Sequence, residues 1–257
     1  MSAPLPSRTA PDGSPYPDRD RPDFEREVRA MFTHIARGYE GFDHLASLGQ
    51  DLLWRPMAIW AVDRYRAGRA VARVLDVGCG TGELSRLVAR HFRDARVTGL
   101  DFTDGMLRRA AAHPRRENRG PQFVRGSALS LPVADRSIDL CTSAFLLRNL
   151  SDLGQGFREI HRVLRPGGTM LALEITEPEG SAIRSLFHAY FDHVVPALGA
   201  AVGSAGPYRY LPDSLRSLPS RAHLLALLGE SGLDRAQAHP LSGGTVTSYL
   251  ASAPETL

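Results

Sequence analysis

The sequence predicts an α/β fold: a mostly parallel, seven-stranded sheet with helices on both faces and a helical lid insertion. Apolar segments of strand length alternate with amphipathic helical segments from Arg73 onward, which is typical of parallel βαβ units. The first strand runs into a glycine-rich turn at Gly78–Gly82, and an amphipathic helix follows directly. At 257 residues the chain is long enough for one well-buried domain with an appended lid, so a second full domain is not required.

Two apolar segments precede the first strand. The spacing of apolar residues predicts an amphipathic helix over Phe24–Tyr39, ended by Gly38 and Gly41. A second apolar segment covers Leu45–Tyr65, and we expect Pro56 to interrupt it.

The middle of the chain supplies the parallel strands. We expect them at Arg73–Val77, Arg96–Leu100, Gln122–Arg125, Ile138–Ser143 and Met170–Ile175. Ser151 can cap the helix before the fifth strand. The buried face of that helix is predicted to hold Leu153, Phe157, Ile160 and Leu164. The run Arg165–Gly168 is expected to end it, because proline cannot continue a helix and glycine supplies positive φ.

The chain closes with a helix over Ala222–Gly232, begun by Ser220, and two further strands. We expect these strands, Arg235–His239 and Thr245–Leu250, to be antiparallel at one edge of the sheet.

Domain organisation follows from composition. Residues 1–22 are rich in Pro, Ser and Asp and lack the apolar core of a signal peptide, which predicts a disordered tail. Residues 23–257 are predicted to form a single domain, in which residues 23–70 supply helices over the site. Residues 177–218 interrupt the alternation with several aromatic residues. We expect them to form a lid or substrate-pocket wall above the carboxyl edge of the sheet, where ligands bind in open α/β sheets.

Charge and cysteine content exclude several classes of protein. The formal charge of +3 is small for this size, so it does not demand a nucleic-acid partner. All 31 cationic residues are arginine, so no lysine can act as a Schiff base or general base. Cys79 and Cys141 lack metal-ligand spacing and fit a reduced compartment, and the histidines form no metal motif. No apolar run is long enough to span a membrane.

The glycine turn indicates the cofactor. Its spacing, with glycines at 78, 80 and 82, differs from the pattern that holds a pyrophosphate, and no Lys-Ser/Thr follows as in a P-loop. The second strand ends in Asp101, where a carboxylate can accept hydrogen bonds from ribose hydroxyls. These features resemble the S-adenosylmethionine site of the Rossmann-like class I methyltransferases. The alternative is an ordinary nucleotide fold with a different ligand.

Further stretches are shared with one family. They are Val28–Tyr39, Ser47–Asp51 with Trp54-Arg55, Phe145–Asn149, Glu159–Gly168, Phe191–Gly199 and Tyr208–Arg216. In these stretches the chain resembles the ubiquinone/menaquinone biosynthesis C-methyltransferases, from about Glu27 to the last strand. The resemblance implies methylation of a ring carbon of a lipophilic, polyprenylated quinol, from demethylmenaquinol to menaquinol or its ubiquinone-pathway equivalent. It also implies a cytoplasmic enzyme in peripheral contact with the inner face of the membrane, and no nucleic acid. A homodimer stays open.

Cofactor contacts of the family carry over onto Thr81, Asp101, Ser127-Ala128 and Ala144. We also expect cofactor contacts at Asp76, Gly78, Gly80, Gly82, Phe102 and Met106. The chain departs from the family at three positions: Ser127 replaces Asp or Asn, Ala144 replaces Ser, and Leu146 replaces Gly. Because Leu146 adds bulk near the reacting centre, these departures bear more on the substrate than on the cofactor.

Catalytic candidates come from the fourth strand's end and the N-terminal helices. Arg148 can lower the pKa of the quinol hydroxyl or orient a water, and Asn149 can fix a ring oxygen. Asp51 and Tyr39 are the next candidates for ring-oxygen contacts or proton transfer, and His193 is a candidate proton relay. The structural alternatives are a salt bridge and a helix cap for Arg148 and Asn149, capping and core packing for Asp51 and Tyr39, and packing for His193.

Tyr208 and Tyr210 are candidates to line the ring slot, with lid packing as the alternative. No metal site is expected. Two other functions stay open: a methyltransferase acting on another aromatic or polyketide metabolite, and a protein that binds S-adenosylmethionine without methylating anything.

Overall fold

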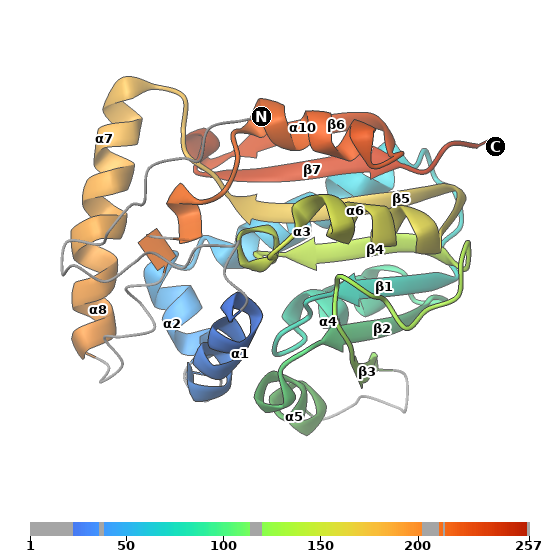
Figure 1. The fold of residues 1–257 in the computed structure, drawn as a ribbon, viewed down its shortest axis with the longest axis horizontal. Coiled ribbons are helices and arrows are strands. Elements are labelled where there is room, and N and C mark those ends of the chain that lie inside the picture. The colour runs from blue at the N-terminus through green and yellow to red at the C-terminus, as the bar shows by residue number, and fades with distance from the viewer. Residues whose placement is uncertain (1–22, 36–38, 114–119, 202–210, 213, 256–257) are drawn as a thin grey trace.

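A seven-stranded sheet runs through the middle of the molecule in the order β3-β2-β1-β4-β5-β7-β6 (Figure 1). This computed structural model describes residues 23–35, 39–113, 120–201, 211–212 and 214–255. The strands are β1 Arg73–Val77, β2 Arg96–Asp101, β3 Gln122–Arg125, β4 Ile138–Ala144, β5 Leu164–Ile175, β6 Asp234–Leu241 and β7 Val246–Ser252. Strands β1 to β5 pair in parallel, whereas β7 is antiparallel to both β5 and β6. The predicted mostly parallel sheet with an antiparallel edge is confirmed.

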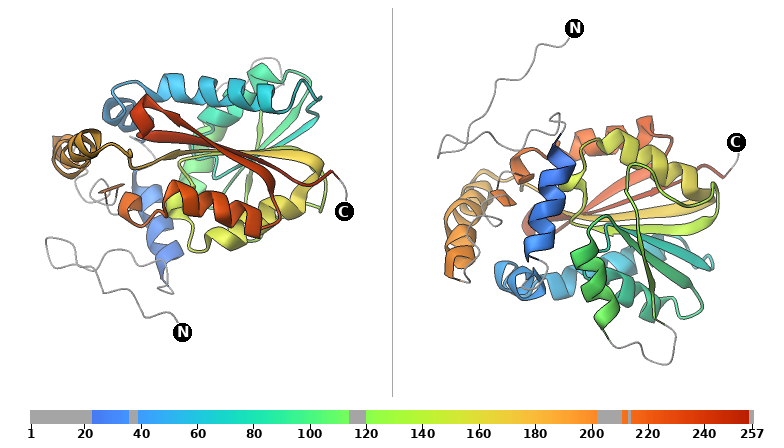
Figure 2. Two further views of the ribbon diagram at one scale, coloured as in Figure 1. Left: turned by 90° about the horizontal axis from the view of Figure 1, so that it is seen from above. Right: turned by 60° about the horizontal axis from the view of Figure 1, so that its bottom comes forward.

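Helices cover both faces of this sheet. The helices are α1 Phe24–Ile35, α2 Tyr39–Ala46, α3 Asp51–Tyr65, α4 Glu83–His91, α5 Asp104–Ala112, α6 Leu153–Val163, α7 Ser181–Ala189, α8 Val195–Ala201 and α10 Arg221–Glu230. Three shorter helical turns are η1 Leu147–Asn149, η2 Tyr190–Val194 and η3 Ser242–Gly244. Helix α3 lies on the opposite face of the sheet from α6 and α10 (Figure 2, left).

Two hydrophobic cores form because successive strand residues point to opposite faces. On β5, Met170 and Ala172 pack with α6 and α10, while Leu171 and Leu173 pack with α3 and α4. The central strands β1, β4, β5 and β7 are therefore buried on both sides, which fixes their register and the positions of the loops that follow them.

The N-terminal helices and the insertion after β5 gather at one edge. Helices α1, α2, α7 and α8 lie beyond the carboxyl ends of the parallel strands, at the left of Figure 1. This is where the sequence predicts helices over the site and a lid. The 1–22 tail and Tyr208 and Tyr210 of the insertion lie outside the described residues.

The N-terminal helices differ from the prediction in two ways. Helix α1 ends at Ile35 and a separate helix, α2, begins at Tyr39, so Gly41 lies inside a helix rather than ending one. Pro56 does not interrupt α3, which is continuous over 15 residues. The proline is exposed, and the carbonyl that loses its intrahelical partner is that of exposed Leu52.

Two predicted boundaries around α6 are wrong. The N-cap is Asp152, whose Oδ1 accepts a hydrogen bond from Gln155 N at 2.8 Å, while Ser151 Oγ donates to Glu25 Oε1 at 2.9 Å. Strand β5 begins at Leu164 and includes Arg165–Gly168, since Leu164 already pairs with Ile138 and a register irregularity absorbs the glycines. The carboxylate cap competes better than the neighbouring hydroxyl for the free N–H groups.

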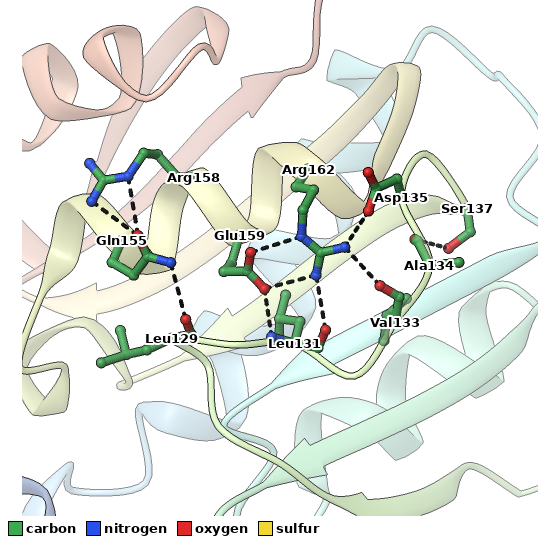
Figure 3. A network of polar contacts seen from close by, with 10 residues as sticks. All are labelled: Leu129, Leu131, Val133, Ala134, Asp135, Ser137, Gln155, Arg158, Glu159 and Arg162. Atoms are coloured by element: carbon green, nitrogen blue, oxygen red, sulfur yellow. Dashed lines mark hydrogen bonds and ion pairs between the residues drawn. The ribbon is translucent and has the colours of Figure 1, made fainter.

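One polar network fixes the loop between β3 and β4 (Figure 3). Arg162 of α6 donates to the carbonyl oxygens of Leu131 and Val133, both at 2.9 Å. Its Nε also donates to Glu159 Oε1 at 2.8 Å, and Glu159 Oε2 accepts from Leu131 N at 2.6 Å. Because these bonds tie the loop to α6, they hold its first residues in place at the carboxyl edge of the sheet.

Candidate functional site

The bend between β1 and α4 requires its glycines. Gly78, Gly80 and Gly82 have φ of 67°, 54° and 84°, a left-handed region that side chains rarely adopt. At Gly82, the residue that precedes α4, an added Cβ would lie 2.6 Å from Phe123 Cζ. The sequence pattern therefore corresponds to a real conformational demand, and the backbone stays open on the side facing the cavity.

Replacing Gly82 with alanine is expected to lower the free energy of unfolding by about 1–3 kcal/mol, through strained φ and overlap with Phe123. Gly229→Ala is the matched control, because Gly229 lies in α10 with no atom within 4 Å of an added Cβ. That change should be neutral or stabilise by up to about 1 kcal/mol. Urea denaturation of both variants checks this, and equal effects would contradict it.

A cavity lies over this bend and collects most of the predicted cofactor contacts. It is lined by Asp76, Gly78, Gly80, Thr81, Asp101, Phe102, Met106, Ser127, Ala128 and Ala144. Of the predicted cofactor residues only Gly82 is not part of the wall, since its role is to start α4. The carboxyl ends of β1, β2 and β4 thus meet around a single space.

Asp101 closes the second-strand side of the cavity. Its Oδ2 accepts a hydrogen bond from Gly80 N at 2.9 Å and its Oδ1 accepts one from Thr103 N at 2.8 Å. Burial raises the pKa of this carboxyl, and the backbone N–H donors oppose that rise. The carboxylate therefore braces the glycine bend while it faces the ligand space.

Asp76 lies beneath the bend. Its two oxygens accept hydrogen bonds from Ser85 Oγ at 2.5 Å and Thr142 Oγ1 at 2.8 Å. Burial raises its pKa to about 6, although both hydroxyls favour the ionised form. This carboxyl is suited to receive a cation, because a positive group in the cavity would stabilise its ionised state.

The raised pKa of Asp76 predicts a pH dependence for ligand binding. As pH falls through about 6 the carboxyl becomes neutral, so affinity for a ligand carrying an ammonium group should fall, by up to about tenfold per pH unit. Between pH 3.8, the unfolded pKa of this group, and about pH 6, the native Asp76 carboxyl holds a proton that the unfolded chain has released. The contribution of Asp76 to the free energy of unfolding therefore increases as pH drops through this range. Calorimetric titrations with S-adenosylhomocysteine from pH 5 to 8 measure the binding effect. If Asp76→Asn showed the same pH dependence of affinity as the wild type, another titrating group would be its cause.

All three departures from the family pattern, Ser127, Ala144 and Leu146, lie in this wall. Ser127 Oγ accepts a hydrogen bond from Leu129 N at 3.2 Å and so stabilises the turn after β3. Leu146 packs against the bend so closely that a Cβ on Gly78 would meet its Cδ1 at 2.6 Å. Leucine at this position fills space next to the bend that a glycine would leave open.

The two leading catalytic candidates are placed differently. Asn149 lines the cavity, and its Nδ2 donates to Phe145 O at 3.0 Å. Arg148 does not line it: the buried guanidinium pairs with Glu174 Oε1 at 2.5 Å, and Glu174 has no solvent exposure. The predicted direct role of Arg148 stays a prediction, and its structural alternative, a salt bridge at a helical turn, is what the geometry displays.

Two of the remaining candidates, Asp51 and His193, do not line the cavity. Asp51 is buried behind it, where hydrogen bonds from Ser47 and Arg55 lower its pKa despite the opposing effect of burial. His193 lies exposed on η2. Tyr39 begins α2, but its side chain is outside the described part of the chain, as are Tyr208 and Tyr210 in full. The structure therefore joins Asn149 to the cofactor residues and leaves these roles as predictions.

Several wall residues were not predicted. They include Glu25 and Phe32 of α1, Arg55 of α3, Glu83 of α4 and Phe145 after β4. Phe145 has a φ of 59°, unusual for a bulky residue, and its ring lies 5.4 Å from Arg55 Cζ and 5.7 Å from Arg148 Cζ. Arg55 stands in the Trp54-Arg55 pair that carried the family resemblance, so that pair was an available signal.

Comparisons with known proteins agree with this geometry. The ubiE/COQ5 methyltransferase family matches residues 22–253. The chain belongs to the ubiE/COQ5 methyltransferase family. It is therefore an S-adenosylmethionine-dependent methyltransferase. We propose that the cavity over the glycine bend is its methyl-donor site.

Two curated relatives span nearly the whole chain. The ubiquinone/menaquinone biosynthesis C-methyltransferase of Syntrophotalea carbinolica is 33% identical, over 87% of this chain and 93% of its own length. The demethylmenaquinone methyltransferase of Porphyromonas gingivalis is 36% identical, over 92% and 96%. This family member is thus similar to quinone-pathway enzymes over most of its length.

Solved structures confirm the class I methyltransferase fold. A methyltransferase of Thermotoga maritima, described as a possible histamine N-methyltransferase, aligns with a TM-score of 0.62 at 16% identity, and the alignment covers 88% of this chain and 99% of the Thermotoga chain. The [4+2]-cyclase SpnF aligns with a TM-score of 0.57 at 20% identity and covers 78% and 80%. Since a cyclase shares the fold, the fold by itself does not determine the acceptor.

Proposed function

We propose that this enzyme methylates a ring carbon of a polyprenylated quinol, from demethylmenaquinol to menaquinol or the ubiquinone-pathway equivalent. The observation that carries the proposal is the position of the Leu147-Arg148-Asn149 turn, which belongs to a stretch that resembles the quinone-pathway methyltransferases and whose Asn149 lines the donor cavity. The names of the similar proteins support the same substrate class.

The reaction is an in-line displacement. The donor's carbon–sulfur bond breaks as a carbon–carbon bond forms to the ring, and the sulfur keeps the electron pair. The ring carbon becomes nucleophilic when the neighbouring hydroxyl loses its proton to water. After methyl transfer the ring proton passes to water, the ring becomes aromatic again and the oxygen takes up a proton, so that one proton is released in all. Holding donor and ring at near-attack distance can supply on the order of 7–11 kcal/mol, so most of the protein's task is positioning.

Side chains of the cavity wall supply that positioning. The Asn149 amide can hydrogen-bond a ring oxygen, and the apolar groups of Ala144, Phe145 and Leu146 offer a water-poor surface for the ring. Arg148 acts in this proposal as a positioning residue: through Glu174 it holds η1, and thereby Asn149, against β5. Leu146 and Ala144 are the departures that keep another phenolic acceptor as the second candidate.

We further propose that the enzyme acts at a membrane surface, where a polyprenyl tail is dissolved. No helix among the described residues is long and apolar enough to cross a membrane. Nine of the ten exposed large apolar side chains of the described residues lie on α2 to α3 or on α7 and η2: Leu45, Leu48, Leu52, Leu53, Met57, Trp60, Ile183, Leu186 and Val194. Arg64 Cζ lies 4.8 Å from the Trp60 ring, a pairing suited to a headgroup region.

Vesicle binding tests this surface separately from catalysis. The double variant Leu52→Glu/Leu53→Glu should lose co-sedimentation with vesicles of phosphatidylcholine and phosphatidylglycerol, yet keep its kcat on a tail-less, water-soluble quinol. Val124→Glu is the matched control, since Val124 is exposed but lies on β3. The proposed membrane surface would be refuted if the double variant sedimented with vesicles as well as the wild type does, or if the wild type did not bind vesicles.

Acceptor selectivity tests the substrate class. With labelled S-adenosylmethionine, kcat/KM should be at least tenfold higher for demethylmenaquinol or a demethylated benzoquinol than for simple soluble phenols. Label entering only other phenols would select the second candidate. Donor binding without turnover on any acceptor would overturn the proposal and favour a non-methylating protein.

A further inference from the structure

Arg55 occupies an unusual position at the donor site. It lies on the inner face of α3 with only 5% of its surface exposed, yet it lines the donor cavity together with Asp76. Its Nη1 donates to Asp51 Oδ2 at 2.7 Å and its Nη2 donates to Glu83 Oε2 at 2.9 Å. The guanidinium is thus held between a helix over the site and the first turn after the glycine bend.

Asp51 fixes the guanidinium from behind. This carboxylate is 1% exposed and accepts further hydrogen bonds from Ser47 Oγ and His44 Nδ1, both at 2.6 Å. Asp51 itself is not in the cavity wall. A carboxylate with so many donors has little freedom to turn, so it orients Arg55 toward the bend.

The cavity wall therefore includes both a cation, Arg55, and a buried acid, Asp76. The methionine end of the donor carries a carboxylate and an ammonium group on one carbon, so its charges are complementary to those of Arg55 and Asp76. We propose that Arg55 binds the donor's carboxylate, while Asp76 faces its ammonium. A guanidinium has five N–H donors in a planar fork, which lets one group contact several carboxylates at once.

Asp51 and Glu83 are positioning residues in this arrangement. Glu83 follows Gly82 directly, so its contact with Arg55 couples the cation to the backbone that approaches the donor. The inference rests on the donor and not on the quinol, so it survives if the acceptor proves to be another phenol. A purely structural Arg55 would instead tie α3 to α4 without touching the ligand.

A matched pair of ligands separates the two possibilities. S-Adenosylhomocysteine and S-adenosyl-3-thiopropylamine differ only in the carboxylate. Calorimetry should show that the wild type prefers the first, and that Arg55→Met reduces this preference on the order of ten- to a hundredfold, the range expected for a charge-assisted contact. Asp101→Asn is the control: it should weaken both ligands alike and leave the preference intact.

Equal weakening of both ligands by Arg55→Met, or an unchanged preference, would overturn the proposal. Because Arg55 is buried, thermal melts are recorded alongside. If the methionine variant does not fold, Arg55→Lys decides: it retains the charge without the fork, and its preference must fall severalfold. Asp51→Asn, which leaves Arg55 in place but weakens its anchor, should reduce the preference by a smaller factor.

Discussion

Arg148→Ala is expected to lower the free energy of unfolding by about 3–5 kcal/mol, the largest effect on stability that the structure predicts. The change leaves Glu174 without its cation at a position with no solvent exposure. The change also removes a guanidinium whose Cζ lies 5.7 Å from the centre of the Phe145 ring. Denaturant titration followed by far-ultraviolet circular dichroism measures the loss.

Two further variants separate the sources of this effect. Arg158→Ala removes an exposed arginine of α6 and should change stability by less than about 0.5 kcal/mol. Arg148→Met/Glu174→Gln removes both charges and should recover most of the lost stability. If it does not, an unpaired buried carboxylate is not the cause.

The double variant also decides how Arg148 contributes to turnover. Since we propose that it positions η1, kcat should recover together with stability. A kcat that stays low in the stable double variant, with donor affinity unchanged, would return to Arg148 the direct role at the quinol hydroxyl.

Asp101→Asn should weaken binding of S-adenosylhomocysteine on the order of a hundredfold, because charge-assisted contacts are lost at two places. The carboxylate accepts from Gly80 N and Thr103 N, and an amide cannot accept from both with equal strength while also receiving ribose hydroxyls. Calorimetry checks this. Asp104→Asn is the control three residues away, an exposed carboxylate paired with Arg125, and should change affinity by less than about threefold. Similar losses in the two variants would mean that Asp101 has no specific role.

Much of the fold could be predicted because its signals are local. Apolar runs such as β4 and the glycines of the bend report directly on burial and on φ. The seven strands were found with end errors of at most two residues, except that β5 begins six residues earlier than predicted. The errors have physical causes. Proline did not break α3 because its lost hydrogen bond falls on the solvent side, and Asp152 outcompeted Ser151 as a cap.

The site was harder to predict from sequence, because contacts between residues far apart in the chain decide which polar groups face the cavity. No sequence feature near Arg148 predicts its partner Glu174, which lies 26 residues further along the chain on β5. The ion pair with Glu174 keeps the guanidinium out of the cavity wall. In the same way, no sequence feature near Arg55 predicts Glu83 of α4, which pairs with the guanidinium at the cavity wall. Asp76 and Asp101 were predictable, since each follows from its place at the end of a strand beside the bend.

The most direct test of the account is the identity of the atom that receives the methyl group. Wild-type enzyme, incubated with ¹³C-methyl S-adenosylmethionine and reduced demethylmenaquinone, should yield a product whose labelled methyl is bonded to a ring carbon, as seen in its carbon–proton NMR correlations. Label on a ring oxygen, or in no quinone product while the donor binds the cavity, would contradict it.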